Sequence, residues 1–199
     1  MRLTEVDNRR EQMKTLLEPH QRPIDRARRI YFDRPSYALD GKHDVEFKIK
    51  SAISEFFGLA FRSVVFTGSA QLGFSPHKDT AFIPGQSDLD VACIDSNLFQ
   101  KYWEYVLTET YAFSNLNKFI DQNHAEKLKD QILRRGMIFV RYLPKGILRR
   151  ETMQFLDGLS VQHRTLFKSV TVAFYVNEYS FCWKQNTAID QITGGQHAK

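Results

Sequence analysis

The pattern of apolar and polar positions in the first third of the chain predicts three helices followed by a strand. Apolar residues recur at helical spacing over residues 44–57, and Gly58 follows as a stop signal. The polar, Arg-rich segment before this helix predicts helices over residues 3–17 and 24–32, with Pro19 and Pro23 separating them. A short apolar run beginning at Ser63 then predicts the first strand.

The remaining pattern alternates strands with helices and indicates one α/β (or α+β) domain, a mixed sheet flanked by helices. We therefore divide the chain into a helical N-terminal arm, residues 1–42, and a domain over residues 43–199. Residues 137–143 fit either a strand or a buried connector. The other expected elements are a strand over 88–94, a helix from 96 capped by Ser96, helices over 123–135 and 178–192, a mildly helical segment over 151–159, and a strand over 170–176.

Two aspartates open the second apolar run, in the sequence Ser-Asp-Leu-Asp-Val-Ala-Cys-Ile over residues 87–94. Because side chains alternate faces along a strand, Asp88 and Asp90 should project to one side while Leu89 projects to the other. Like charges held this close repel each other, and a fold commonly tolerates them when a cation such as Mg²⁺ or Mn²⁺ lies between them. The pair is a candidate metal site.

The first strand ends in Gly68-Ser69, which could supply the phosphate-binding half of the same site. Gly68 can adopt backbone angles that are closed to other residues. Ser69 can offer both a hydroxyl and a backbone N–H to an anion. A glycine-serine pair or an aspartate pair alone is a weak signal, but their combination after a predicted helix is more specific.

The succession of strand, Gly68-Ser69 turn and strand with Asp88-Leu89-Asp90 resembles the core of the DNA polymerase beta-like nucleotidyltransferase superfamily. The resemblance covers residues 44–95 closely. It implies a nucleoside triphosphate such as ATP as substrate, two divalent ions held by three carboxylates, and Asp88 and Asp90 as catalytic metal ligands. Small members of this superfamily also resemble components of bacterial toxin–antitoxin and antiphage systems, which implies a role in antiviral defence and a protein partner.

The chain departs from that pattern in two places. Eighteen residues separate Ser69 from Asp88, an unusually long insertion in which Lys78 is a candidate nucleotide-binding residue and Asp79 a candidate metal ligand. The expected third carboxylate is absent from the predicted strand over 170–176. Glu178, just beyond that strand, is the preferred candidate for the third metal ligand.

Composition restricts the remaining possibilities. The net charge of +5 is unevenly placed, because residues 125–150 hold eight Lys or Arg against two acids. This segment is either a solvated helix face or a surface for RNA or DNA, with Phe139 and Tyr142 available for stacking. Cys93 and Cys182 lie in separate apolar runs, which favours buried thiols in a reducing cytoplasm. No apolar stretch is long enough to span a membrane, so no membrane association is expected.

Two functions remain open. The first is a Mg²⁺-dependent nucleotidyltransferase that moves a nucleotidyl group from a nucleoside triphosphate to an unidentified acceptor. The alternative is a catalytically weak or inactive nucleotide-sensing module acting with a protein or RNA partner, which the acid-free strand favours.

Overall fold

The computed structural model describes residues 4–17 and 21–194 of the chain. Leu3 and Pro19, which the sequence places at the start of the first helix and at its break, lie outside the described residues. The helices are α1 (Glu5–Lys14), α2 (Pro23–Tyr31), α3 (His43–Phe57), α4 (Gly68–Leu72), α5 (Ser96–Thr110), α6 (Gln122–Arg135), α7 (Ile147–Gln162) and α8 (Glu178–Thr193). The strands are β1 (Val64–Thr67), β2 (Phe74–Ser75), β3 (Thr80–Ala81), β4 (Leu89–Ile94), β5 (Met137–Phe139) and β6 (Val170–Tyr175). Short 3-10 turns include η1 (Tyr37–Leu39) and η4 (Val140–Tyr142).

Four strands form a mixed sheet in the order β1-β4-β6-β5. Strand β4 runs antiparallel to β1 and parallel to β6, and β5 runs antiparallel to β6. The parallel register places Asp90 opposite Thr171 and Ile94 opposite Tyr175. The predicted mixture of helices and strands around a mixed sheet is thus confirmed.

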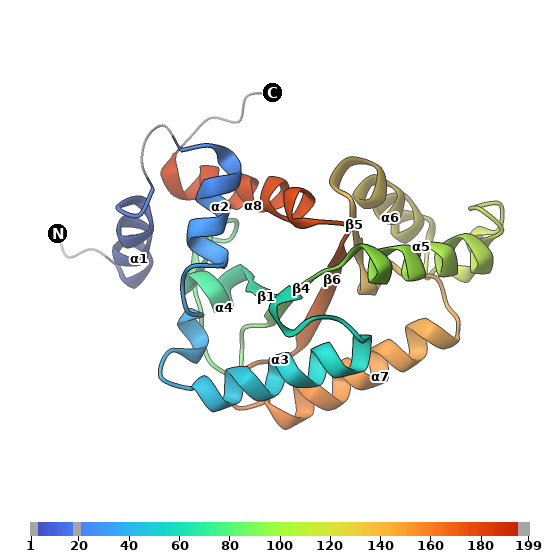
Figure 1. The fold of residues 1–199 in the computed structure, drawn as a ribbon, viewed down its shortest axis with the longest axis horizontal. Helices are drawn as coiled ribbons and strands as arrows, with labels where there is room; N and C mark the ends of the chain where they lie inside the picture. Colours follow the sequence, from blue (N-terminus) through green and yellow to red (C-terminus); the bar gives the residue numbers. More distant parts are fainter. Residues whose placement is uncertain (1–3, 18–20, 195–199) are drawn as a thin grey trace.

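Side-chain alternation divides the interior into two cores, one on each face of the sheet. Leu89, Val91 and Cys93 belong to the core on the face covered by α3 and α7, whereas Ala92 of the same strand belongs to the other core. This second core also contains Tyr175 and residues of α2 and α8. Figure 1 shows the sheet between α3 and α7 on one side and α2 and α8 on the other. The molecule therefore has three layers.

The N-terminal arm is partly built into the second core. Helix α2 packs against α8 and buries Ala27, Ile30 and Tyr31. The guanidinium of Arg26 joins the two helices through a 2.7 Å ion pair with Asp190. Helix α1 is more polar and buries only Met13 among its described residues.

Local structure differs from expectation in three places. Helix α4 begins at Gly68 and extends into the insertion after Ser69, which also forms the two-stranded β2–β3 hairpin. The segment expected to be mildly helical forms the longer helix α7. Asp95, not Ser96, caps α5, because its carboxylate accepts a 2.8 Å hydrogen bond from the backbone N–H of Leu98. Across residues 4–17 and 21–194, no helix is both long and apolar enough to cross a membrane.

Candidate functional site

The two aspartates lie at the start of β4, on the sheet face that α2 and α8 only partly cover. Asp88 and Asp90 both line a pocket of about 690 Å³, while Leu89 is fully buried in the opposite core. The predicted alternation is therefore confirmed. Helices α2 and α8 cover this face farther along, around Ala92 and Tyr175, which leaves the carboxylate end accessible from the pocket.

Gly68 approaches the carboxylate of Asp90 more closely than any residue with a side chain could. Strand β1 pairs Thr67 with Asp90, and Gly68 follows with a φ of +63°. A Cβ atom added at Gly68 would collide with Oδ2 of Asp90. Both the backbone angle and the contact require glycine here. Gly68 and Ser69 line the same pocket as the aspartates, so the structure brings together all four residues that the sequence singled out.

Two hydroxyl groups on or beside β6 bind the carboxylates. The hydroxyl of Thr171 donates a 2.6 Å hydrogen bond to Oδ1 of Asp90, and that of Ser169 donates a 2.7 Å bond to Oδ1 of Asp88. Both contacts follow from the parallel pairing of β4 with β6. Each carboxylate therefore has one oxygen engaged by a neutral donor. The position beside Asp90 on the adjacent strand is taken by threonine rather than by an acid.

The charge on Asp90 is costly in this environment. Burial is the main cause that raises the pKa of its carboxyl, and the nearby charge of Asp88 raises it further. The hydrogen bond from Thr171 and the more distant charges of Arg141 and Lys78 act in the opposite direction without cancelling the effect. Because burial and mutual repulsion disfavour the charged form of Asp90, a bound cation would stabilise the carboxylate pair.

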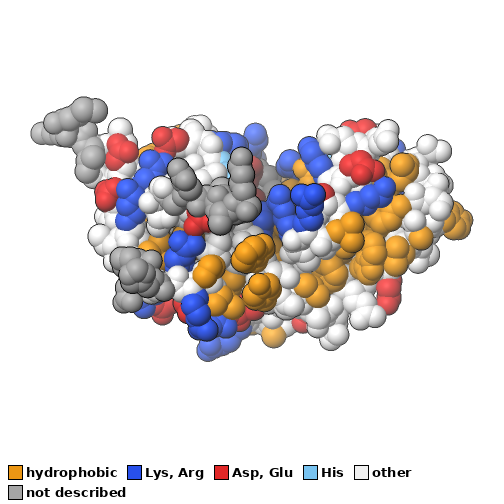
Figure 2. Space-filling view, turned by 90° about the horizontal axis from the view of Figure 1, so that it is seen from above, with side chains coloured by type: hydrophobic (Ala, Val, Ile, Leu, Met, Phe, Trp, Pro, Cys, Tyr) orange, Lys and Arg blue, Asp and Glu red, His pale blue; other side chains and the backbone are white. Residues whose placement is uncertain are grey.

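Four cationic side chains line the pocket and come from different elements. They are Lys78 in the β2–β3 hairpin, Arg135 at the end of α6, Lys168 before β6 and Lys184 in α8. Among the residues that the structure describes, none of the four forms an ion pair with a carboxylate. Figure 2 shows Lys and Arg side chains on both sides of a hollow near the middle of the upper face. The pocket therefore combines a carboxylate pair with uncompensated positive charge.

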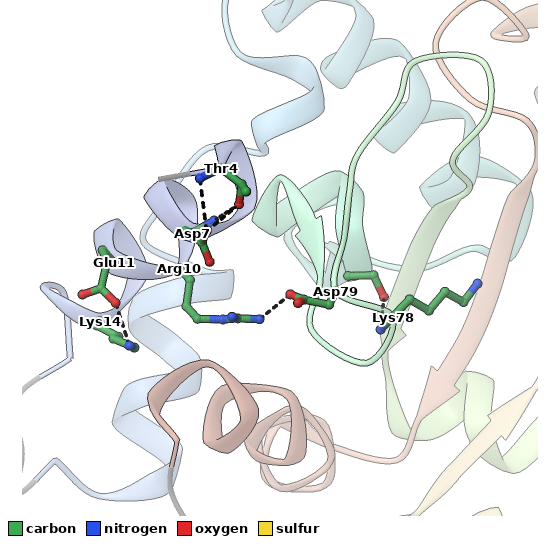
Figure 3. Close-up of polar contacts among 8 residues, drawn as sticks. Thr4, Asp7, Arg10, Glu11, Lys14, Lys78 and Asp79 are labelled. Carbon is green, nitrogen blue, oxygen red and sulfur yellow. Dashed lines mark hydrogen bonds and ion pairs between the residues drawn. The ribbon is translucent and has the colours of Figure 1, made fainter. Parts of the chain in front are cut away.

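The β2–β3 hairpin separates its two candidate residues. Lys78 lines the pocket, whereas Asp79 is outside it and forms a 2.6 Å ion pair with Arg10 of α1. Figure 3 shows Arg10 reaching Asp79 while the side chain of Lys78 extends away from it. His77 also lines the pocket, and burial is the main cause that lowers its pKa. The structure thus places Lys78 near the aspartate pair and engages Asp79 elsewhere.

Glu178 is not brought to the aspartates. It begins α8 and pairs at 2.6 Å with Arg28 of α2, beside a different depression on the surface. Thr171 is opposite Asp90, and Glu178 lies beyond Tyr175 at the other end of β6. Thr171 and Tyr175 alone are about 13 Å apart along the strand. The expected bend of Glu178 back to the metal site is absent.

The basic segment over residues 125–150 forms one wall of the pocket. Arg135, Phe139 and Tyr142 line it, and the rings of Phe139 and Tyr142 meet edge to face at 5.8 Å. Part of the positive charge of this segment is neutralised locally, as in the pair of Arg134 with Asp130. The segment is therefore more than a solvated helix face, because part of it lines the candidate site.

Several pocket residues were missed by sequence reasoning. Thr171 was detectable as the polar position in an otherwise apolar strand, but its partner depended on the strand register. Tyr31 and Lys184 gave no sequence signal, because they come from helices whose periodicity only indicates packing. Their convergence depends on the contact between α2 and α8.

The residues present fit a metal that is shared with a phosphate ligand. Among the described residues, no group of three or more His, Cys, Asp or Glu side chains is arranged to hold a metal ion. Mg²⁺ is, however, commonly bound through one or two carboxylates, with water and substrate phosphates completing its coordination. Asp88 and Asp90 can supply the carboxylates and the cations around them can hold the phosphates. The pair matches this mode of binding better than an all-protein cage.

Comparison with known proteins adds no assignment. No protein-family model, curated protein or solved structure shows a significant match to this chain.

Proposed function

We propose that this chain binds a nucleoside triphosphate together with Mg²⁺ or Mn²⁺ and transfers its nucleotidyl group to an acceptor. One observation carries the proposal: Asp88 and Asp90 share a pocket with the Gly68-Ser69 turn and with cations from four separate elements. The sequence resemblance to nucleotidyltransferases supports the same reading. A nucleotidyltransferase-like fold and a cytoplasmic location remain part of this proposal.

Electrostatics favour a metal-bound polyphosphate over either ligand alone. A free triphosphate would be repelled by the two carboxylates, and a free metal ion by the surrounding lysines and arginine. When both bind together, the carboxylates face the metal and the cations face the phosphate oxygens. Lys78 and Lys184 come from the β2–β3 hairpin and from α8, so they can contact the same polyphosphate from different elements.

The residues of the chain would act mainly by positioning. Asp88 and Asp90 would hold the metal. When bound, the metal would neutralise part of the phosphate charge. The hydrogen bond from Thr171 to Oδ1 would keep the carboxylate of Asp90 oriented for that role. Ser69, with its hydroxyl and backbone N–H, would orient the phosphates against Gly68.

A nucleotide-sensing module without turnover is the second candidate, and Thr171 favours it. The residue beside Asp90 on β6 is a neutral hydroxyl, and Glu178 and Asp79 are engaged by arginines elsewhere. Two carboxylates can retain a metal–nucleotide complex while supporting little transfer. In this case the basic segment over residues 125–150, which places Arg135 and Tyr142 in the pocket wall, would contact an RNA or protein partner.

The test measures binding and transfer separately. Calorimetry with ATP, GTP, CTP and UTP, each with Mg²⁺ or Mn²⁺, should detect metal-dependent binding to the unaltered protein. Asp90→Asn should abolish that binding while the protein remains folded, because it removes charge at constant volume. Asp157→Asn, on the exposed side of α7, is the matched control and should change nothing.

Incubation with a labelled triphosphate, the metal and a pool of RNA and protein acceptors then decides between the two functions. Label transfer supports the nucleotidyltransferase. Binding without transfer supports the sensing module. If no triphosphate binds with either metal, both functions are wrong.

A further inference from the structure

One part of the pocket, the recess, is lined by buried polar side chains from three elements. Tyr31 at the end of α2, Tyr175 at the end of β6 and Gln185 of α8 form it, and these side chains are only 4%, 3% and 7% exposed. Lys184, the neighbour of Gln185, lines the same pocket. Leu72 and Ala188 add apolar surface. The recess therefore presents hydroxyl, amide and ammonium groups in a largely water-excluded space.

The hydroxyl of Tyr31 has no hydrogen-bond partner. Its oxygen is buried, and no donor or acceptor of the described chain reaches it. Leaving a buried hydroxyl unpaired costs free energy, so nearly all such groups in folded proteins are satisfied by protein, water or ligand. The packing of Tyr31 edge-on against Phe181 at 5.6 Å fixes the ring in this position. A ligand oxygen entering the recess would satisfy the hydroxyl.

The positive charge beside the recess also favours an anionic ligand. Burial is the main cause that lowers the pKa of Lys184, and the positive charge of Arg135 lowers it further. Among the described residues, Asp90 is the acid that opposes this shift of the Lys184 pKa, and the net direction stays downward. Lys184 and Arg135 repel each other, and little negative charge offsets this repulsion. A phosphate bound between them would stabilise both charges.

We propose that this recess binds the terminal phosphate group of a nucleoside triphosphate, with the hydroxyl of Tyr31 and the ammonium of Lys184 as its donors. The inference rests on the proposed function, since Asp88 and Asp90 would hold the metal-bound part of the same molecule. Thr171 and Tyr175 lie on the same face of β6, about 13 Å apart along the strand, and the recess and the two carboxylates line the same pocket. Tyr31 links the N-terminal arm to substrate selection.

The experiment compares ATP, ADP, AMP and inorganic tripolyphosphate, each with Mg²⁺, by calorimetry on the full chain. The unaltered protein should bind ATP at least about tenfold more tightly than ADP, and should bind tripolyphosphate. Tyr31→Phe removes only the hydroxyl, and Lys184→Met removes the charge at similar length. Each should weaken ATP binding by about tenfold or more and leave ADP affinity nearly unchanged.

Two controls match the variants in chemistry. Tyr179→Phe alters an exposed tyrosine of α8, and Lys101→Met an exposed lysine of α5; neither lines the pocket. Equal losses for ATP, ADP and AMP in Tyr31→Phe and Lys184→Met would overturn the terminal-phosphate assignment, as would a changed preference for the base. Triphosphate binding that neither variant alters would overturn it while leaving the proposed function intact. If the unaltered protein binds neither a nucleotide nor tripolyphosphate, both proposals are wrong.

Discussion

The hydroxyl of Thr171 donates a 2.6 Å hydrogen bond to Oδ1 of Asp90 across the parallel β4–β6 pair. The sequence resemblance to nucleotidyltransferases leads us to expect a third carboxylate on a strand such as β6. The residue beside Asp90 on β6 is therefore neutral, and its hydrogen bond orients the Asp90 carboxylate.

Replacing Thr171 by aspartate should create a three-carboxylate site. Without metal, Thr171→Asp should lower the free energy of unfolding by about 1–3 kcal/mol at neutral pH, because a third negative charge joins Asp88 and Asp90. Mg²⁺ or Mn²⁺ should restore that loss and should bind about tenfold more tightly than in the unaltered protein. Thermal unfolding with and without metal, together with calorimetry, measures both effects.

Thr171→Asn is the control, since it has the shape of aspartate without the charge. It should show neither the destabilisation by repulsion nor the rescue by metal. A Thr171→Asp protein that stays destabilised in saturating Mn²⁺ would show that the residue beside Asp90 does not face the metal position.

Gly68→Ala should disrupt the site more than its backbone angle alone explains. The φ of +63° costs about 1 kcal/mol for alanine, and the added Cβ would also collide with Oδ2 of Asp90. We expect a total loss of about 2–4 kcal/mol of stability and loss of metal-dependent binding. Gly58→Ala is the matched control, with a φ of +68° and open space around its Cβ position. Equal destabilisation of the two variants, measured by denaturant unfolding, would contradict the close contact.

The parts of this molecule that sequence could predict are those governed by local periodicity. Asp88 and Asp90 were placed on one face because strand alternation is a property of consecutive residues. Gly68 was expected near them because its turn ends the preceding strand, and the antiparallel pairing of β1 with β4 brings it there. The position of Glu178 was wrong because a residue beyond a strand end can turn in either direction, and here Arg28 of a distant helix holds it.

Other features depended on contacts between distant segments. The partnership of Thr171 with Asp90 required the parallel register, which no short pattern encodes. Asp79 was considered as a metal ligand because its loop connects two site strands, yet its side chain turns to Arg10 of the N-terminal helix. The recess around Tyr31 exists only because α2 packs against α8.

Removing either proposed substitute for the third carboxylate should leave the site working. Asp79 pairs with Arg10 and Glu178 pairs with Arg28, so neither carboxylate is available to the metal. We expect Asp79→Ala and Glu178→Ala to retain metal-dependent triphosphate affinity within about twofold. Each should lose at most about 1 kcal/mol of stability, because both ion pairs are solvent-exposed. Loss of metal dependence in calorimetry of Glu178→Ala would return that residue to the metal site.

Phosphate binding at the recess should be coupled to the protonation of Lys184. In the free protein, burial and Arg135 lower the pKa of its ammonium below the ordinary value of 10.5, while Asp90 opposes the shift. A bound phosphate favours the charged form and raises the pKa again. Affinity for ATP should therefore be full below the pKa of Lys184 in the free protein and decline as pH rises through it.

Calorimetry in buffers of different ionisation enthalpy should accordingly detect proton uptake on ATP binding in the alkaline range. Arg135 and Asp90 are the charged groups that act on Lys184, and burial raises the pKa of the neighbouring Tyr175 away from that of the ammonium. His77 also lies near Lys184, but its pKa is lowered from 6.5, so it titrates only in the acidic range. Lys184→Met should abolish the alkaline proton uptake, and Lys101→Met should retain it. Uptake that persists in Lys184→Met would show that another group senses the phosphate.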